Sequence, residues 1–198
     1  MAKGVLVLCL IATVPALATV INFDNLSNGD VVTNQYAGVV FSSTTGFVNF
    51  VTTQPAYQST PPNFICSGPA GGSIDCAHET ILTFSSAANG LSFDALGIND
   101  VSANVAQVDV FTNGVFNSTV IIPGNAQGFA PEHIDLSAFA GVTKIRIYNI
   151  TDAAGIGWDT FTYNQSLGTP EPAAWMFAGS GLLLLMLGRV SGTRRRRS

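Results

Sequence analysis

Charged side chains are scarce in this 198-residue chain, at 10% of its residues, and the basic ones are concentrated at its two ends. Between Thr19 and Thr169 only Lys144 and Arg146 are basic, against eleven acidic residues, which gives this region a formal charge of about −9. A nucleic-acid-binding protein needs a basic surface that neutralises phosphates. The composition therefore excludes nucleic acid as a partner of the central region.

Catalytic motifs are also missing. The chain has no Gly-x-Ser-x-Gly elbow, no His-Glu-x-x-His zinc motif and no phosphate-cradling glycine loop before a helix. Glu79 and Glu132 could in principle be the acid and base of a glycosidase, and each lies next to a histidine, His78 or His133. Carboxylates occur in any sequence, however, and caps and turns explain these pairs equally well. We therefore expect a protein that is not an enzyme.

Residues 1–18 have the composition of a secretory signal peptide. Lys3 precedes an apolar run over 5–14, and Ala16-Leu17-Ala18 provides a cleavage site. The run is too short to span a bilayer comfortably as a permanent helix. We predict cleavage by signal peptidase after Ala18; a buried N-terminal helix is the alternative.

Export determines how the cysteines are interpreted. Cys9 leaves with the signal peptide, so the mature chain carries Cys66 and Cys76 in an oxidising compartment. The segment between them is rich in glycine, which suits closure of a small ring. We predict a disulfide whose eleven-residue loop contributes roughly 2.5–3 kcal/mol. A metal site that includes His78 and a free thiol are the alternatives.

The C-terminal region has three parts in a fixed order. Residues 167–172 form a linker with a Pro-Glu-Pro motif, 173–188 are uncharged and could form a transmembrane helix of about 24 Å, and 189–198 form a basic tail. The arginines are expected to stay cytoplasmic, which leaves the main domain outside the membrane. The motif consists of Pro170, Glu171 and Pro172, and the basic residues of the tail are Arg189, Arg194, Arg195, Arg196 and Arg197.

This order resembles the PEP-CTERM sorting signal of exported Gram-negative proteins. The resemblance implies processing by an exosortase, a membrane enzyme thought to cleave near the Pro-Glu-Pro motif. The protein would then pass from the inner membrane, with its domain outside, to the cell surface or an exopolysaccharide matrix. One departure from the pattern is that Val-Ser-Gly-Thr separates Arg189 from the main arginine run. An unprocessed membrane anchor is the alternative.

The central region, 19–166, favours strands and turns because helix-favouring charged residues are few and β-branched and aromatic residues are frequent. Asn113-Gly114 is a strong hairpin signal, and 137–141 could form a single helical turn. Short alternating runs with this spacing predict an all-β fold, a β-sandwich of jelly-roll type. The expected strands are 20–23, 39–42, 47–52, 80–84, 90–95, 104–112, 115–122, 133–136, 144–149 and 157–163.

Alternation within two of these strands assigns their faces. Ile145 and Ile147 are expected to point to the core, and the opposite face then presents Lys144, Arg146 and Tyr148. In the last strand, Asp159 is expected on the same side as the core residues Phe161 and Tyr163. Residues 54–76 form the longest expected irregular stretch, so a loop-borne binding site is expected there.

The segments INFDNLSNGDVVTNQYAGVVFSS and GIGWDTFTY resemble the first and last parts of jelly-roll domains that are frequent in PEP-CTERM proteins. The wider group is similar to carbohydrate-binding and galactose-binding-like modules, in which a structural calcium often bridges the first and last strands. The resemblance implies Asp24 and Asp159 as calcium ligands. Trp158 stands where a second acidic residue is usual, and capping of a turn is the alternative role of Asp24.

These features together predict a non-enzymatic exported protein of the envelope or extracellular matrix that associates with exopolysaccharide. A specific carbohydrate-binding module is the alternative, and a glycan-active enzyme is a more distant one. Sugar binding needs aromatic platforms, although a core position is the alternative for each aromatic residue. The candidates are Trp158, Tyr148, Tyr57 and Phe129.

Overall fold

The computed structural model describes residues 18–53, 60–71, 75–125 and 130–165. By its internal contacts the chain divides into two units, 1–166 and 167–198, and all described residues belong to the first. The predicted signal peptide, Pro-Glu-Pro linker, transmembrane segment and basic tail lie outside the described residues, apart from Ala18. Within the described ranges no helix is long and apolar enough to cross a membrane.

The described part of the chain is all-β, and each strand pair is antiparallel. Pairing connects the strands in the order β2-β4-β5-β11-β6-β10-β7-β8, with β1 on β11 and with β3 and β9 on β6. The strands are β1 (Ala18–Ile21), β2 (Val31–Val32), β3 (Val39–Ser42), β4 (Phe47–Thr52), β5 (Phe64–Pro69), β6 (Thr80–Leu96), β7 (Ala106–Thr112), β8 (Val115–Ile122), β9 (Glu132–Asp135), β10 (Val142–Tyr148) and β11 (Gly157–Gln165).

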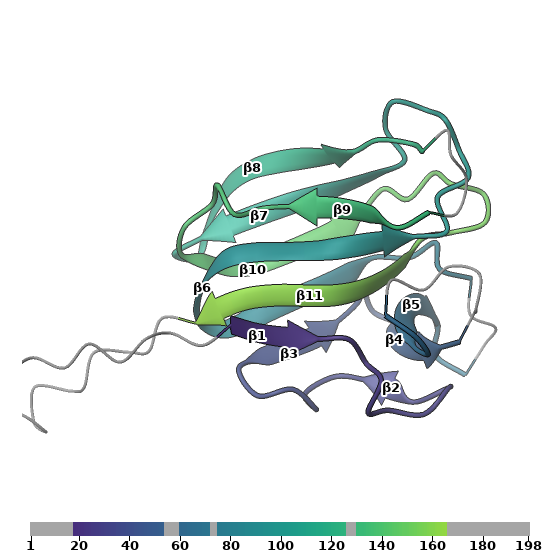
Figure 1. Ribbon diagram of the computed structural model, residues 1–198, viewed down its shortest axis with the longest axis horizontal. Helices are drawn as coiled ribbons and strands as arrows, with labels where there is room; N and C mark the ends of the chain where they lie inside the picture. The colour runs from purple at the N-terminus through teal and green to yellow at the C-terminus, as the bar shows by residue number, and fades with distance from the viewer. Residues whose placement is uncertain (1–17, 54–59, 72–74, 126–129, 166–198) are drawn as a thin grey trace, which may run out of the picture. The chain divides into compact units, whose positions relative to one another are not determined.

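The long strand β6 belongs to two layers, which makes the fold a β-sandwich (Figure 1). Its first part, up to Phe84, lies between β3 and β10. Its second part pairs with β11 from Ala88 onwards and with β9 over Ser92–Ala95. One layer therefore consists of β3, β6, β10, β7 and β8, and the other contains β9, β6, β11, β1, β5, β4 and β2.

A cluster of buried aromatic rings joins the two layers. Phe41 of β3 contacts Phe161 of β11 with ring centroids 5.8 Å apart, and Phe161 stacks on Phe93 at 5.2 Å. Phe23 packs edge-on against both Phe41 and Phe161. All four rings are at most 1% exposed. Edge-to-face and offset pairs of this kind add to the stability that burial of apolar area already provides.

The strands predicted at 39–42, 47–52 and 115–122 are confirmed with the same bounds as β3, β4 and β8. The hairpin at Asn113-Gly114 is also confirmed, since both residues have the positive φ angles, 51° and 80°, that a type I′ turn requires. The ranges expected at 80–84 and 90–95 are parts of the single strand β6.

Two local predictions are wrong. Residues 137–141 do not form a helical turn, because the chain makes a tight turn in which Phe139 N–H donates to the Leu136 carbonyl at 3.0 Å. The stretch expected to be irregular up to residue 76 contains β5, in which Phe64–Cys66 are buried and pair with β4. Its apolar start is short, and the Ser-Gly-Pro that follows is typical of a turn.

The predicted face of Asp159 is also wrong, because β11 contains a bulge. Asp159 pairs with Asp94, whereas Phe161 stacks on Phe93, the neighbour of Asp94 on the opposite face of β6. Thr160 takes a positive φ of 50° at this bulge. The extra residue shifts the alternation, so Asp159 and Phe161 lie on opposite faces of the sheet.

Candidate functional site

The outward-facing side chains of β3, the first part of β6, β10, β7 and β8 form a surface that we call the outer face. Directly paired residues of neighbouring strands share a face, so the registers define its rows. The predicted inward direction of Ile145 and Ile147 is confirmed, since both are fully buried. The first row of the outer face is Phe116, Phe111, Lys144, Thr83 and Val40; the second is Thr119, Asp109, Arg146, Ile81 and Ser42; the third contains Ile121, Gln107 and Tyr148.

Arg146 lies among charged and polar side chains on the outer face, with the Asp109 carboxylate 4.0 Å from its guanidinium. Its Nε donates to the Glu79 carboxylate, and its guanidinium lies 4.4 Å from the ring centroid of Tyr148. The Asp109 carboxylate accepts hydrogen bonds from Thr119 at 2.6 Å and from the Tyr148 hydroxyl at 3.2 Å. Side-chain exposure is 41% for Arg146 and 9% for Glu79. These contacts therefore present a cation to solvent above a nearly buried carboxylate.

Aromatic rings continue the outer face towards β8. Lys144 Nζ lies 3.7 Å from the ring centroid of Phe111, a cation–π contact. Phe111 in turn packs edge-on against Phe116 at 5.8 Å, and Phe116 is 54% exposed. The two basic residues of the described chain thus both lie over aromatic rings on this face.

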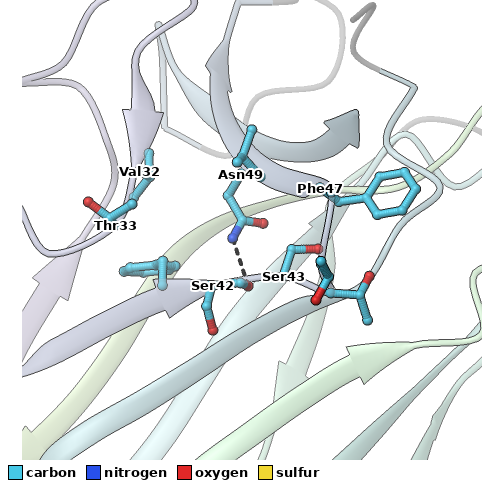
Figure 2. Close-up of a pocket in the computed structure, with 11 residues that line it drawn as sticks. Val32, Thr33, Ser42, Ser43, Phe47 and Asn49 are labelled. Atoms are coloured by element: carbon cyan, nitrogen blue, oxygen red, sulfur yellow. Dashed lines mark hydrogen bonds between the residues drawn. The ribbon is translucent and has the colours of Figure 1, made fainter. Parts of the chain in front are cut away.

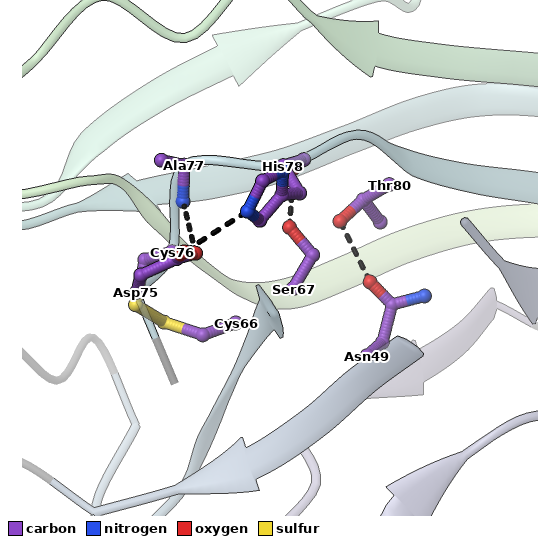
Figure 3. Close-up of a disulfide and its surroundings, with 8 residues drawn as sticks. All are labelled: Asn49, Cys66, Ser67, Asp75, Cys76, Ala77, His78 and Thr80. Carbon is purple, nitrogen blue, oxygen red and sulfur yellow. Dashed lines mark hydrogen bonds and ion pairs between the residues drawn. A yellow bond between two sulfur atoms is a disulfide. The ribbon is translucent and has the colours of Figure 1, made fainter. Parts of the chain in front are cut away.

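The segment that carries Glu79 is fixed by two serine side chains. Ser43 Oγ donates to the Glu79 carbonyl, and Ser67 Oγ donates to the His78 carbonyl. These serines come from the turn after β3 and from β5, so both layers hold the backbone that presents Glu79. Figure 3 shows the contact of Ser67 with the His78 backbone. A carboxylate fixed in this way can hold the Arg146 guanidinium in one position.

The disulfide predicted between Cys66 and Cys76 is confirmed, with 4.6 Å between the Cα atoms. Both thiols are therefore joined, and neither the metal site nor the free thiol considered from the sequence applies to them. The bridge fastens the chain three residues before Glu79 (Figure 3). Immediately beyond, the Thr80 hydroxyl donates to Asn49 Oδ1 at 2.7 Å, so the Glu79 segment is anchored at both ends.

His78 belongs to the same region but points to other partners. Its Nε2 lies 2.9 Å from an Asp75 carboxylate oxygen, and its ring stacks on Phe47 with centroids 3.8 Å apart. Figure 3 shows the imidazole directed towards Asp75. These contacts give His78 a packing role beside the disulfide.

A hollow of about 280 Å³ opens between β2, β4 and the turn after β3 (Figure 2). Asn49, which is fully buried, lines it and donates from Nδ2 to the Ser42 carbonyl at 2.9 Å. Since Ser42 belongs to the second row of the outer face, the hollow adjoins that face. The sequence signal that could have found it is the hydroxyl-rich run SSTT at 42–45. The other lining side chains with polar groups are Thr33, Ser43, Thr44 and Thr45.

The two carboxylates implied as calcium ligands lie at one corner of the sandwich. Asp24 accepts from the Asn63 backbone N–H at 3.2 Å, and Asp159 accepts from the Thr60 N–H and hydroxyl at 3.0 Å each. The pKa of the nearby Tyr36 phenol is raised to about 12. Burial is the largest cause, and the negative charges of Asp24 and Asp159 add to it. The fold thus brings the first and last strands together here.

At this corner, the two carboxylates accept hydrogen bonds from donors of the protein itself. All four oxygens of Asp24 and Asp159 accept hydrogen bonds from N–H or O–H groups, and calcium takes six to eight oxygen ligands, more than these two carboxylates supply. The described residues also contain no cluster of three or more His, Cys, Asp or Glu side chains that could share a metal ion. As arranged, protein donors hold both carboxylates, and the structural calcium expected from the resemblance stays a prediction.

The remaining site candidates are placed as follows. Trp158 is fully buried and packs against Phe93, so it is not a sugar platform, whereas Tyr148 lies on the outer face. Tyr57 and Phe129 lie outside the described residues.

The two glutamates weighed as a catalytic pair occupy different layers of the sandwich. Glu79 precedes the first part of β6 and binds Arg146, while Glu132 of β9 pairs with Ala95 in the second part. The neighbouring His133 contacts Asp94, with 2.9 Å between Nδ1 and Oδ1. The absence of enzymatic activity stays a prediction.

No protein-family model and no curated relative matches this chain. Solved structures with some similarity include the K2 cleaved adhesin domain of Lys-gingipain, with 14% identity, a TM-score of 0.47, and coverage of 74% of this chain and 99% of that one. A family 29 carbohydrate-binding module in complex with mannohexaose has 12% identity, a TM-score of 0.35, and coverage of 76% and 93%. A second structure of that module family has 14% identity, a TM-score of 0.35, and coverage of 76% and 90%. At these low values the likeness does not extend to function.

Proposed function

We propose that this chain is a non-enzymatic, exported protein of the bacterial envelope or extracellular matrix whose β-sandwich binds polysaccharide through the outer face. The observation that carries the proposal is Arg146, held by Glu79 over the ring of Tyr148. A sugar ring presents apolar C–H groups on its faces and hydroxyl groups around its edge. A surface that recognises them combines aromatic contact area with a few fixed polar groups, and the outer face offers both.

The charges of the outer face favour a neutral polysaccharide. Lys144 and Arg146 are offset by Glu79 and Asp109, so the face is locally neutral while the described domain is strongly acidic. An anionic polymer would be repelled by the domain as a whole. A neutral chain meets charge-assisted donors and acceptors that are already oriented, so less conformational freedom is lost on binding.

The terminal segments support the location. The N-terminal segment directs export and is removed after Ala18 by signal peptidase, and the Pro-Glu-Pro motif with its basic tail directs the chain to an exosortase. Release or transfer at that point leaves the sandwich, of jelly-roll type as the resemblance implies, next to exopolysaccharide. In that position, a face that binds neutral polysaccharide can attach the protein to the surrounding matrix.

The hollow beside Ser42 favours the alternative function, a lectin-like module that recognises a specific sugar residue. Its hydroxyl-lined wall adjoins the outer face, and its volume of about 280 Å³ suits a small polar group. In this alternative the hollow, not the aromatic row, determines which polymer binds. Thr33→Val would then weaken binding while Phe116→Ala would leave it unchanged.

The proposal is tested by affinity electrophoresis of the full chain in mild detergent, in gels containing a series of neutral polysaccharides. Phe116→Ala and Arg146→Met are each expected to weaken retardation by roughly tenfold in dissociation constant, about 1.4 kcal/mol. Val101→Ala is the matched control, because Val101 is 73% exposed in the loop after β6 and lies off the outer face. Retardation by no polymer, or equal retardation of all four proteins, would contradict binding at this face.

A further inference from the structure

The bond at which we predict signal-peptide cleavage lies within strand β1 of the folded domain. In the antiparallel pairing of β1 with β11, Ala18 lies opposite Asn164. Thr19, on the other side of the bond, lies opposite Tyr163. Figure 1 shows β1 running alongside the end of β11. Both residues that flank the bond are therefore held in a sheet.

Buried side chains hold β1 in this sheet. Ile21 is 1% exposed and lies opposite Phe161, a member of the aromatic cluster that joins the two layers. Phe23, just after β1, belongs to the same cluster and is fully buried. Thr19 shares the inward face of Ile21, because side chains two apart in a strand point the same way. Lifting Thr19 and the residues after it away from β11 therefore exposes apolar area of the core.

A paired strand is a poor substrate for a protease. Cleavage of native proteins concentrates at exposed loop tips, and a bond inside a packed element is reached only while that element is open. Opening of β1 costs its backbone hydrogen bonds to β11 and the burial of Ile21. Cleavage of the folded chain is therefore limited to the fraction of molecules in which β1 is detached.

We infer that docking of β1 on β11 closes the signal peptidase site, so that the signal peptide has to be removed before the domain completes its fold. This inference rests on the export and processing in the proposed function. The strand β11 is the last of the described chain, so it is exported after the cleavage site. Signal peptidase then acts on a chain in which the partner strand of β1 is still missing.

The meeting of the two ends of the domain makes this order important. Because Ala18 pairs with Asn164, the chain enters and leaves the sandwich at neighbouring strand positions. A precursor that folded before cleavage would keep its apolar N-terminal run, 5–14, at the membrane. Exosortase cleavage near the Pro-Glu-Pro motif would remove only the C-terminal segment and would not release that precursor. Release to the matrix therefore depends on removal of the signal peptide first.

The test is digestion of the full chain, with its native disulfide, by signal peptidase in mild detergent, followed by intact mass. Phe161→Asp provides the undocked reference, because it places a charge opposite Ile21 and leaves the cleavage site unchanged. Cleavage after Ala18 is expected to be roughly tenfold or more slower in the wild type than in this reference.

A pair of matched variants separates opening of β1 from opening of the whole domain. Ile21→Ala should speed cleavage roughly tenfold over the wild type, because it removes the buried side chain that fastens β1. Ile122→Ala is the control, since Ile122 is equally buried but belongs to β8 in the other layer. It should leave the cleavage rate close to that of the wild type.

Equal cleavage of the wild type and Phe161→Asp would overturn the inference and leave export and polysaccharide binding intact. Equal acceleration by Ile21→Ala and Ile122→Ala would also overturn it, since the whole domain and not β1 would then protect the bond. If none of the four chains were cleaved after Ala18, the signal peptide would be removed from the proposed function, and this inference with it.

Discussion

The guanidinium of Arg146 and the carboxylate of Glu79 meet across 67 positions of sequence and join the exposed surface of β10 to the segment fastened by the disulfide. Glu79 is only 9% exposed on its side chain, whereas Arg146 is 41% exposed. Loss of the arginine would leave a nearly buried carboxylate without its cation, which costs more than an exposed ion pair contributes. The pair therefore matters to both the stability and the surface chemistry of the sandwich.

Arg146→Met is expected to lower the free energy of unfolding by about 1–2 kcal/mol, because the aliphatic stem is kept while the Glu79 carboxylate loses its donor. Lys144→Met is the matched control. Its ammonium lies over Phe111, so its loss should cost below about 1 kcal/mol. Urea denaturation of both variants measures the difference. Equal costs would show that the Glu79 contact is as dispensable as the cation–π contact.

Removal of the disulfide by the double substitution Cys66→Ala and Cys76→Ala is expected to lower the free energy of unfolding by about 3 kcal/mol, from the entropy of an eleven-residue loop. Because the bridge lies three residues before Glu79, the same variant should also weaken polysaccharide retardation. Urea denaturation and affinity electrophoresis give the two readouts. The intact protein treated with dithiothreitol should behave like the double variant, and a reduced protein of unchanged stability would disprove the estimate.

Patterns within one strand predicted much of this structure. The alternation in 144–148 placed Ile145 and Ile147 inward and Arg146 outward, and the loop between Cys66 and Cys76 predicted their bridge. Partners on other strands were not predictable in the same way. Asp109 joins Tyr148 only through the β7–β10 register, which depends on pairing across distant parts of the chain.

The bulge in β11 shows a second limit. Thr160 is a β-branched residue with a positive φ, a conformation that its residue type does not favour and that no local sequence pattern indicates. The packing of Trp158 and Phe161 on the same ring, Phe93, requires the extra residue between them. Tertiary packing therefore decided the face of Asp159, against the simple period of two.

Gly155→Ala is expected to destabilise the protein by about 3 kcal/mol or more, the size associated with overpacking and strain. Gly155 has a φ of +75°, and an added Cβ would lie 2.4 Å from the Asp75 carbonyl oxygen and 2.6 Å from the Cys76 Cβ. Gly29→Ala is the control, since Gly29 also has a positive φ, +92°, but nothing within 4 Å of the added carbon. It should cost about 1–2 kcal/mol from backbone strain alone. Thermal melting compares the stability of the two variants. Similar losses would show that Asp75 and Cys76 move to accommodate the added carbon at little cost.

Tyr36 should make the fold sensitive to alkaline pH. Its pKa is raised from 10.0 to about 12 by burial and then by Asp24 and Asp159, so between these values the unfolded chain loses the phenolic proton while the folded chain retains it. The contribution to stability is therefore complete below pH 10 and is lost as the pH rises through about 12. Phenolate absorbance should show a step near pH 12 that disappears in Tyr36→Phe. A variant with an unchanged titration curve would contradict this assignment.

The intact mass of the protein from native cells tests its processing. We expect a mature species that begins at Thr19, since signal peptidase cleaves after small residues such as Ala18. We expect its end near Pro170–Pro172, where the proposed exosortase cleavage would remove the uncharged segment and the arginine tail. Glu171→Ala should retain that tail, and Glu132→Ala, which leaves the motif intact, should not. A wild-type species that keeps Arg194–Arg197 would show that the protein stays anchored in the membrane and that no exosortase cleaves it.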